Sequence, residues 1–158
     1  MTSDEEIRYY WRLRWLSSIQ AFCDTEVQAK CWLNPEERNP HYSFIECMCC
    51  YFDDAFMSEE DVFERRVARQ HMTNEEVDAV AQFHSMAEAY QSPNNDDYDV
   101  RAILSDHKWH EVVKAAQNVA QKLLKLLKTP EEKDALTLPL QWSELEKGGW
   151  EAEFPRSP

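Results

Sequence analysis

The feature that most constrains the fold is an apolar stripe at helical spacing, which runs without a break through residues 106–128. Apolar residues that recur every three or four positions lie on one face of an α-helix. Ser105 or Asp106 can cap the start of this helix, and lysines near its end suit the negative pole of the helix dipole. We therefore predict a long amphipathic helix that packs on a core. The residues of the stripe are Trp109, Val112, Val113, Ala116, Val119, Ala120, Leu123, Leu126 and Leu127.

Glycine is scarce, and this scarcity favours helices in the rest of the chain. Only Gly148 and Gly149 occur among 158 residues, whereas a β-rich protein of this size needs many turns that contain glycine. Hydrophobic residues make up 43% of the chain, which is typical of a globular protein and not of a disordered acidic one. We predict an all-α fold in which residues 1–158 form a single domain, a bundle of about seven helices around the long helix at 106–128.

Capping patterns indicate five further helix starts, each a Ser or Thr followed three positions later by Glu, Asp or Gln. The pairs are Ser3/Glu6, Thr25/Gln28, Ser58/Asp61, Thr73/Glu76 and Thr129/Glu132. The helices predicted from them cover about 4–23, 25–33, 58–70, 73–90 and 129–139. A short helical turn at 100–104 leads into the long helix, and a last turn at 143–147 ends at Gly148.

Residues 41–57 are apolar around most of a helical circumference. We predict that they form the most buried helix of the domain, with one narrow polar strip toward water. A strand is the competing interpretation, but the apolar residues do not alternate as a half-buried strand requires. The strip consists of Ser43, Glu46, Cys50, Asp53 and Asp54.

The chain contains no run of about eighteen apolar residues, so we expect no membrane-spanning helix. The first ten residues are acidic and lack the basic and apolar regions of a secretory signal. We therefore expect a cytoplasmic protein.

Negative charge is concentrated in the first part of the chain. Residues 1–99 hold 21 Asp and Glu against 8 Lys and Arg, a difference of −13, and residues 100–158 hold 9 of each. Nucleic acid and anionic membranes would repel such a molecule, so we exclude both as partners. A basic protein is the natural electrostatic partner. The alternative is that the acidity serves solubility alone.

The densest acidic region is residues 46–99, with 14 acids against 3 bases. Even if some acids pair with the bases, a negative surface should remain there. We predict that this surface binds the partner, because carboxylates speed association and aromatic anchors slow dissociation. The predicted acidic contacts are Asp53, Asp54, Glu59, Glu60, Asp61, Glu75, Glu76, Asp78, Asp96, Asp97 and Asp99, and the predicted anchors are Tyr90 and Tyr98.

Cysteine and histidine clusters suggest a metal site, but each has a simpler interpretation. Cys47 and Cys50 lie three apart on one helix face, yet no second pair follows as zinc sites require. Within an apolar helix we expect Cys47 and Cys49 to be small core residues. His107 and His110 stand at the start of the long helix with no Glu-x-x-His motif nearby, so we interpret them as polar surface residues. His84 lies on an apolar stripe, and we expect a hydrogen-bonded core histidine there.

Two carboxylate clusters resemble cation sites only in part. Asn95, Asp97, Asp99 and Asp106 match some ligand positions of a calcium loop, but Val100 stands where that loop needs glycine. Several glutamates suggest the magnesium sites of helical pyrophosphatases, but most of them fall in first helical turns, where capping explains them. These are Glu59, Glu60, Glu64, Glu75 and Glu76. We predict neither a metal nor another cofactor.

These observations favour a binding protein over an enzyme. The most specific hypothesis is an acidic module of the kind found among bacterial immunity proteins and antitoxins, which neutralise a basic partner such as a nuclease toxin. One alternative is a non-catalytic scaffold or regulatory subunit whose acidity only serves solubility. A second alternative is a metal-dependent helical hydrolase built on the cysteine or carboxylate clusters.

Overall fold

The computed structural model describes residues 3–34 and 43–139, and these residues form helices and turns with no strand. The predicted all-α, single-domain bundle is therefore confirmed. The described residues hold eight α-helices, one more than the approximate count predicted. They are α1 (Asp4–Cys23), α2 (Thr25–Leu33), α3 (Phe44–Cys49), α4 (Val62–Ala68), α5 (Asn74–Ala89), α6 (Val100–Leu104), α7 (His107–Leu126) and α8 (Pro130–Thr137), with a π-helix η2 (Cys50–Asp54) and a 3-10 turn η3 (Pro93–Asn95). The turn predicted at 143–147 lies outside the described residues.

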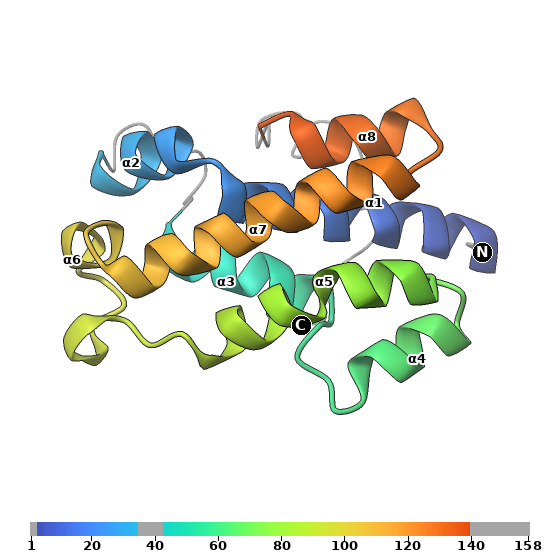
Figure 1. Ribbon diagram of the computed structural model, residues 1–158, viewed down its shortest axis with the longest axis horizontal. Helices are drawn as coiled ribbons and strands as arrows, with labels where there is room; N and C mark the ends of the chain where they lie inside the picture. Colours follow the sequence, from blue (N-terminus) through green and yellow to red (C-terminus); the bar gives the residue numbers. More distant parts are fainter. Residues whose placement is uncertain (1–2, 35–42, 140–158) are drawn as a thin grey trace.

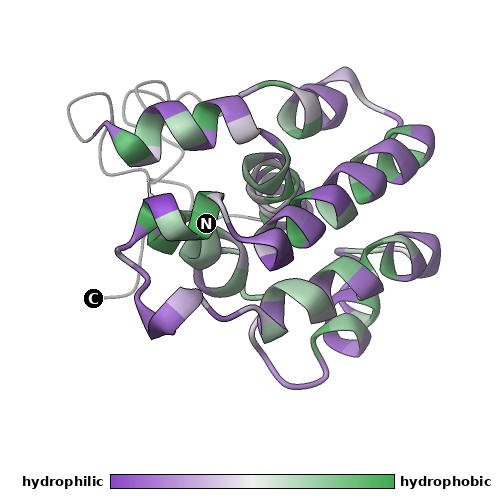
Figure 2. Ribbon diagram, turned by 60° about the vertical axis from the view of Figure 1, so that its left-hand side comes forward, coloured by the Kyte–Doolittle hydropathy of each residue, from purple (hydrophilic) through white to green (hydrophobic). Residues whose placement is uncertain are grey.

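Two helices of twenty residues, α1 and α7, carry most of the packing. The long helix α7 lies against α1 and α5, and α8 folds back along α1 (Figure 1). The residues of the predicted stripe are buried except for Ala120, which is half-buried, and Leu126, which is 37% exposed. Helix α1 is as central as α7, because it also contacts α3 and η2. Each long helix in Figure 2 carries both hydrophobic and hydrophilic residues, as expected of helices that share one core.

Trp109 stands at the centre of the aromatic core and is 1% exposed. Its indole N–H donates to the Oε1 of Gln28 at 3.1 Å, and the Gln28 amide donates to the carbonyls of Ala21 and Phe22. This chain of hydrogen bonds fixes α2 against α1 and α7, because a buried indole N–H needs an acceptor. The rings with centroids within 6 Å of Trp109 are Phe22, Trp32, Phe44 and Tyr90.

Most of the predicted caps are present. The side chains of Ser3, Thr73 and Thr129 each accept the backbone N–H three residues later, and Asp106 caps α7. Thr73 forms a complete capping box, since the carboxylate of its partner Glu76 also accepts the Thr73 backbone N–H. One cap is displaced by a residue, because Asp24 and not Thr25 caps α2.

The helix predicted over 41–57 is confirmed for residues 44–54, but the prediction that it is one regular helix through Met57 is wrong. An α-helix begins after the cap at Ser43 and changes at Cys50 into the π-helix η2, which ends at Asp54, while residues 41–42 lie outside the described part. The buried residues Cys47, Tyr51 and Ala55 recur every four positions. A wider π turn accommodates this spacing better than the 3.6 residues of an α-helix.

The predicted cap at Ser58 and Asp61 is also wrong. The Ser58 N–H bonds to the carbonyl of Phe52 at 3.1 Å, so this segment closes a turn after η2 and α4 begins only at Val62. Asp61 has a φ of 55° and makes no side-chain cap. Phe56 and Gln70 also have positive φ, near 60°. Three left-handed residues other than glycine therefore lie within 56–70, where local sequence signals favoured a simple helix.

Candidate functional site

Three of the predicted contact acids, Glu59, Glu60 and Asp61, come together at a hollow of about 530 Å³ between the start of α4 and the second half of α5. Glu64 and Glu88 bring two further carboxylates to it. We call it the acidic hollow. The described residues that line it include five acids and neither Lys nor Arg. They are Ser58, Glu59, Glu60, Asp61, Val62, Phe63, Glu64, His84 and Glu88.

The backbone leading into the acidic hollow is irregular and locally unfavourable. The π-helix η2 is followed by left-handed residues at Phe56 and Asp61, and such a residue other than glycine costs about 1 kcal/mol. A ring as large as that of Phe56 is a true outlier in this region. Its conformation is held from both sides, because the Phe56 N–H donates to the carbonyl of Asp53 and its carbonyl accepts from Arg66 at 3.1 Å.

His84 forms the inner wall of the acidic hollow and is 7% exposed. Its Nε2 lies 3.5 Å from the Glu88 carboxylate and its Nδ1 lies 2.9 Å from the Tyr51 hydroxyl. Because an ionised carboxylate only accepts, Nε2 carries the proton and Nδ1 accepts from Tyr51. Burial lowers the pKa of His84, although Glu88 opposes this shift, so the imidazole is neutral near pH 7. The predicted hydrogen-bonded core histidine is confirmed.

The side chains of Glu88, His84 and Tyr51 are linked in space in the order carboxylate, imidazole, hydroxyl. The same order occurs in acid–base catalysis. Tyr51 is fully buried, however, and burial raises the pKa of its hydroxyl. A nucleophile must reach its substrate, and this hydroxyl cannot. We therefore interpret the arrangement as a support that fixes the wall of the hollow.

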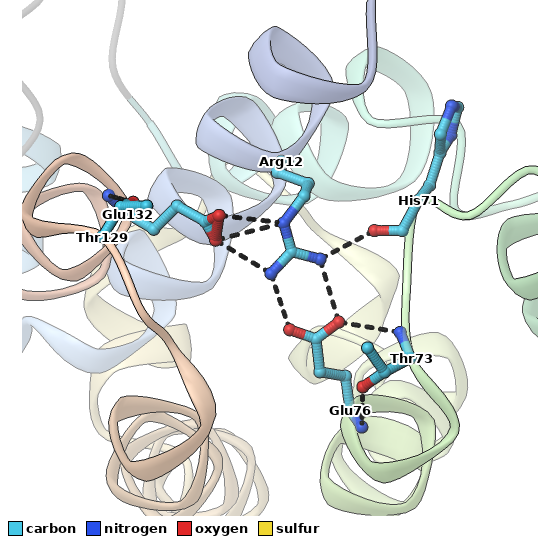
Figure 3. A network of polar contacts seen from close by, with 6 residues as sticks. All are labelled: Arg12, His71, Thr73, Glu76, Thr129 and Glu132. Atoms are coloured by element: carbon cyan, nitrogen blue, oxygen red, sulfur yellow. Dashed lines mark hydrogen bonds and ion pairs between the residues drawn. The ribbon is translucent and has the colours of Figure 1, made fainter. Parts of the chain in front are cut away.

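Glu76, one of the predicted surface acids, is 2% exposed, so its predicted place on the binding surface is wrong. Its carboxylate forms a two-pronged ion pair with Arg12, at 2.9 and 2.7 Å (Figure 3). Burial would raise the pKa of Glu76, but the bonds to Arg12 and to Thr73 hold it below its ordinary value. The capping pattern predicted only the local bond to Thr73.

Arg12 joins three helices and is itself buried. Its guanidinium also binds the carboxylate of Glu132, which belongs to α8, at 2.9–3.2 Å, and it donates to the carbonyl of His71 at 2.8 Å (Figure 3). Burial would lower the pKa of Arg12, but Glu76 and Glu132 together raise it. All of its donors are used, so Arg12 holds α1, α5 and α8 together and has none left for a ligand.

The other predicted acids do not line the acidic hollow. Asp53 is exposed and Asp54 half-buried in η2, while Glu75 and Asp78 are exposed on α5. The three acids of the loop after α5 are exposed and make local bonds. Asp96 accepts the Tyr98 N–H, Asp97 accepts the Ser92 hydroxyl, and Asp99 caps α6.

The two predicted aromatic anchors differ in exposure. Tyr90 is half-buried against Phe44 and Trp109, and its hydroxyl donates to Asp106 at 2.9 Å, so it is already occupied within the fold. Tyr98 is 82% exposed. Phe56 is 49% exposed two residues before the hollow begins, and the sequence reasoning missed it. No pattern in the sequence predicts that a phenylalanine within this apolar run points outward.

Within residues 3–34 and 43–139, no three His, Cys, Asp or Glu side chains lie together as a metal site would need. The cysteines there are free thiols, with Cys47 buried as predicted but Cys49 only half-buried. His107 is largely exposed and pairs with Glu111 at 3.1 Å, and His110 bonds to the carbonyl of Leu104. Asp106 and the loop acids that resembled a calcium site are engaged in the local bonds above.

Residues 7–133 match the model of a family described as a domain of unknown function, DUF7945. The chain belongs to the DUF7945 family. The DUF7945 match extends from α1 into α8, so it includes the acidic hollow and the ion-paired residues Arg12, Glu76 and Glu132. A search of curated proteins and a search of solved structures each found no match.

No described helix of this DUF7945 protein is both long and apolar enough to cross a bilayer.

Proposed function

We propose that this DUF7945 protein is a binding module that recognises a basic protein through the acidic hollow. The observation that carries the proposal is the lining of the hollow, where five carboxylates meet without a Lys or Arg among the described lining residues. Such a concentration of one sign of charge attracts a cationic partner and raises its association rate.

The chemistry of the hollow suits a lysine or arginine side chain. These side chains have an apolar stem and a charged head. Val62 and Phe63 offer apolar surface to the stem, and the surrounding carboxylates accept hydrogen bonds from the head. Phe56, which is half-exposed and precedes the first lining residue by two positions in the chain, offers an aromatic contact of the kind that slows dissociation.

The most specific form of this proposal is an immunity or antitoxin protein that neutralises a basic toxin such as a nuclease. The uneven charge supports it, since the acidic region would cover the surface that a nuclease uses to bind phosphates. The competing form is a scaffold or regulatory subunit whose acidity serves solubility alone. The two differ in whether the position of the acids affects binding.

A pull-down from the native host tests the proposal. The bait is the full chain, compared with a variant that carries Glu59→Gln, Glu60→Gln and Asp61→Asn. The matched control carries Asp4→Asn, Glu5→Gln and Glu6→Gln, which removes the same charge from exposed positions in the first turn of α1. We expect the wild type and the control to recover a basic protein and the hollow variant to lose it. Equal recovery by all three, or no basic protein at all, would leave only the solubility explanation.

A further inference from the structure

We propose that Phe56 is an anchor residue, which a rigid turn at residues 55–57 holds out toward solvent so that its ring enters an apolar pocket on the basic partner. The inference rests on the proposed function, which identifies that partner, and adds to it a second contact that controls dissociation. Phe56 stands two residues before Ser58, the first lining residue of the acidic hollow. Two residues of chain span at most about 7 Å, so one partner can contact the ring and the hollow together.

Phe56 combines two features that a folded protein usually avoids. Its φ of 57° is left-handed, and a residue with a bulky side chain is an outlier there. It is also 49% exposed, whereas Ala55 and Met57 on either side of it are fully buried. A single exposed aromatic residue is ordinary on a protein surface, but strained residues gather at binding sites and switches. The two features together point to a functional use of the ring.

Hydrogen bonds and burial fix the turn on both sides of Phe56. The Trp11 indole N–H donates to the carbonyl of Ala55 at 2.9 Å, and the Phe56 N–H donates to the carbonyl of Asp53 at 3.2 Å. Ala55 and Met57 belong to the hydrophobic core. A segment that is already fixed loses little conformational freedom on binding, so less of the interaction energy is lost to ordering. The turn is therefore preorganised to present an anchor.

Arg66 holds both the backbone and the ring of Phe56. One guanidinium nitrogen donates to the Phe56 carbonyl at 3.1 Å, and the guanidinium carbon lies 5.9 Å from the centre of the Phe56 ring. A cation at this distance is attracted to the face of an aromatic ring. The same carbon lies 5.0 Å from the centre of a Trp11 ring, and Arg66 is 2% exposed, so the group that holds Phe56 is itself fixed in the interior. Phe56 therefore keeps one orientation while about half of its surface stays open to a partner.

The chemistry of the ring defines the kind of pocket that it fits. A phenylalanine ring has no hydrogen-bonding group, so its transfer is favourable where it leaves water for apolar surroundings. Aromatic residues are enriched at the buried cores of protein interfaces, where such anchors slow dissociation. The carboxylates of the acidic hollow require basic residues on the same surface of the partner. The matching pocket is therefore apolar and is flanked by lysine or arginine.

Binding kinetics of Phe56 variants of the full chain test the anchor, with the basic protein that the wild type recovers in the pull-down as the probe. Phe56→Gly and Phe56→Asn both remove the ring, and glycine and asparagine both tolerate the left-handed backbone. We expect each variant to dissociate about thirtyfold faster, the effect of a typical hot spot, and to associate at nearly the rate of the wild type. Tyr98→Asn is the matched control, because it removes an aromatic ring that is 82% exposed in the loop after α5, and it should dissociate as the wild type does.

Unchanged dissociation in both Phe56 variants would overturn the anchor, and so would an equal increase in the Tyr98 variant. Neither Phe56 variant should melt below the wild type, because each relieves an unfavourable backbone conformation, and a lower melting temperature in both would contradict our account of the turn. The variant with Glu59→Gln, Glu60→Gln and Asp61→Asn separates the two proposals. If it slows association while the Phe56 variants leave dissociation unchanged, the proposed function stands and the anchor fails. If the wild type recovers no basic protein, both fail.

Discussion

At the scale of single residues, several residues other than glycine adopt the left-handed backbone conformation that glycine usually occupies. Gln70 is the clearest case, with a φ of 62° just past the end of α4. The Gln70 N–H bonds to the carbonyl of Val67 and the His71 N–H to that of Arg66, which together form the Schellman motif that usually carries glycine. The side chain of Gln70 is exposed, so the cost lies in the backbone.

Gln70→Gly should therefore stabilise the protein by about 1 kcal/mol, because the left-handed conformation is unfavourable for residues with a Cβ. The free energy of unfolding in urea measures this change. Gln82→Gly is the matched control, since Gln82 is an exposed residue within α5. It should destabilise the protein by roughly 0.5–1 kcal/mol. The same sign of effect at both positions would contradict our account of the turn.

Arg12 illustrates a residue whose importance depends on burial. Arg12→Met leaves the carboxylates of Glu76 and Glu132 without their cation, and Glu76 is buried. Breaking such a pair from one side costs about 3–5 kcal/mol. We expect a loss of this size in chemical unfolding. Arg8→Met provides a comparison on the same helix, because Arg8 is exposed, and a similar loss there would mean that Arg12 is not special.

His71 should make the stability of the protein sensitive to mild acid. Its folded pKa of about 4 lies below the ordinary value of 6.5, so the unfolded chain takes up the proton first. The stability that the neutral ring provides is complete above about pH 6.5 and is lost as the pH falls toward 4. Urea unfolding between pH 7 and 4 should show this decline, and His71→Asn should make it shallower. An unchanged slope would contradict a neutral, buried His71.

At the scale of elements, the sequence predicted helices whose signals are local. The caps at Ser3, Thr73 and Thr129 were sufficient to predict where α1, α5 and α8 begin, and the apolar stripe was sufficient to predict α7. Each of these signals depends on residues within a few positions. The π-helix and the turn at 55–61 have no such signal. They depend on how Tyr51 and Phe56 meet distant partners, which are His84 and Arg66.

The packed face of α7 is open to a direct test. Leu123 is fully buried and Lys125 is exposed. Leu123→Asp should unfold or aggregate the protein, since it places an unpaired charge in the core. Lys125→Glu should change stability by no more than about 0.5 kcal/mol. Thermal unfolding followed by circular dichroism compares the two, and similar behaviour would mean that the buried face is misassigned.

At the scale of the whole molecule, the sequence predicted an acidic surface. It did not predict which acids gather at the hollow and which are buried in ion pairs. Charge counting placed Glu76 with the surface acids, although it pairs with Arg12, which is 64 residues away in the chain. It also missed the contribution of Glu88 to the hollow. Both depend on which faces of α1, α4 and α5 meet, and composition carries no information on that. The three acids at 59–61 were predicted from the sequence because they are neighbours in the chain.

The most direct test of the central claim is the association rate of the recovered basic partner, measured at several salt concentrations. The wild type and the α1 control, with Asp4, Glu5 and Glu6 neutralised, should associate fast at low salt and slow steeply as the Debye length shrinks to about 8 Å. The hollow variant, with Glu59, Glu60 and Asp61 neutralised, should associate more slowly and respond less to salt. Indistinguishable rates and salt dependences for the hollow variant and the α1 control would contradict binding at the acidic hollow.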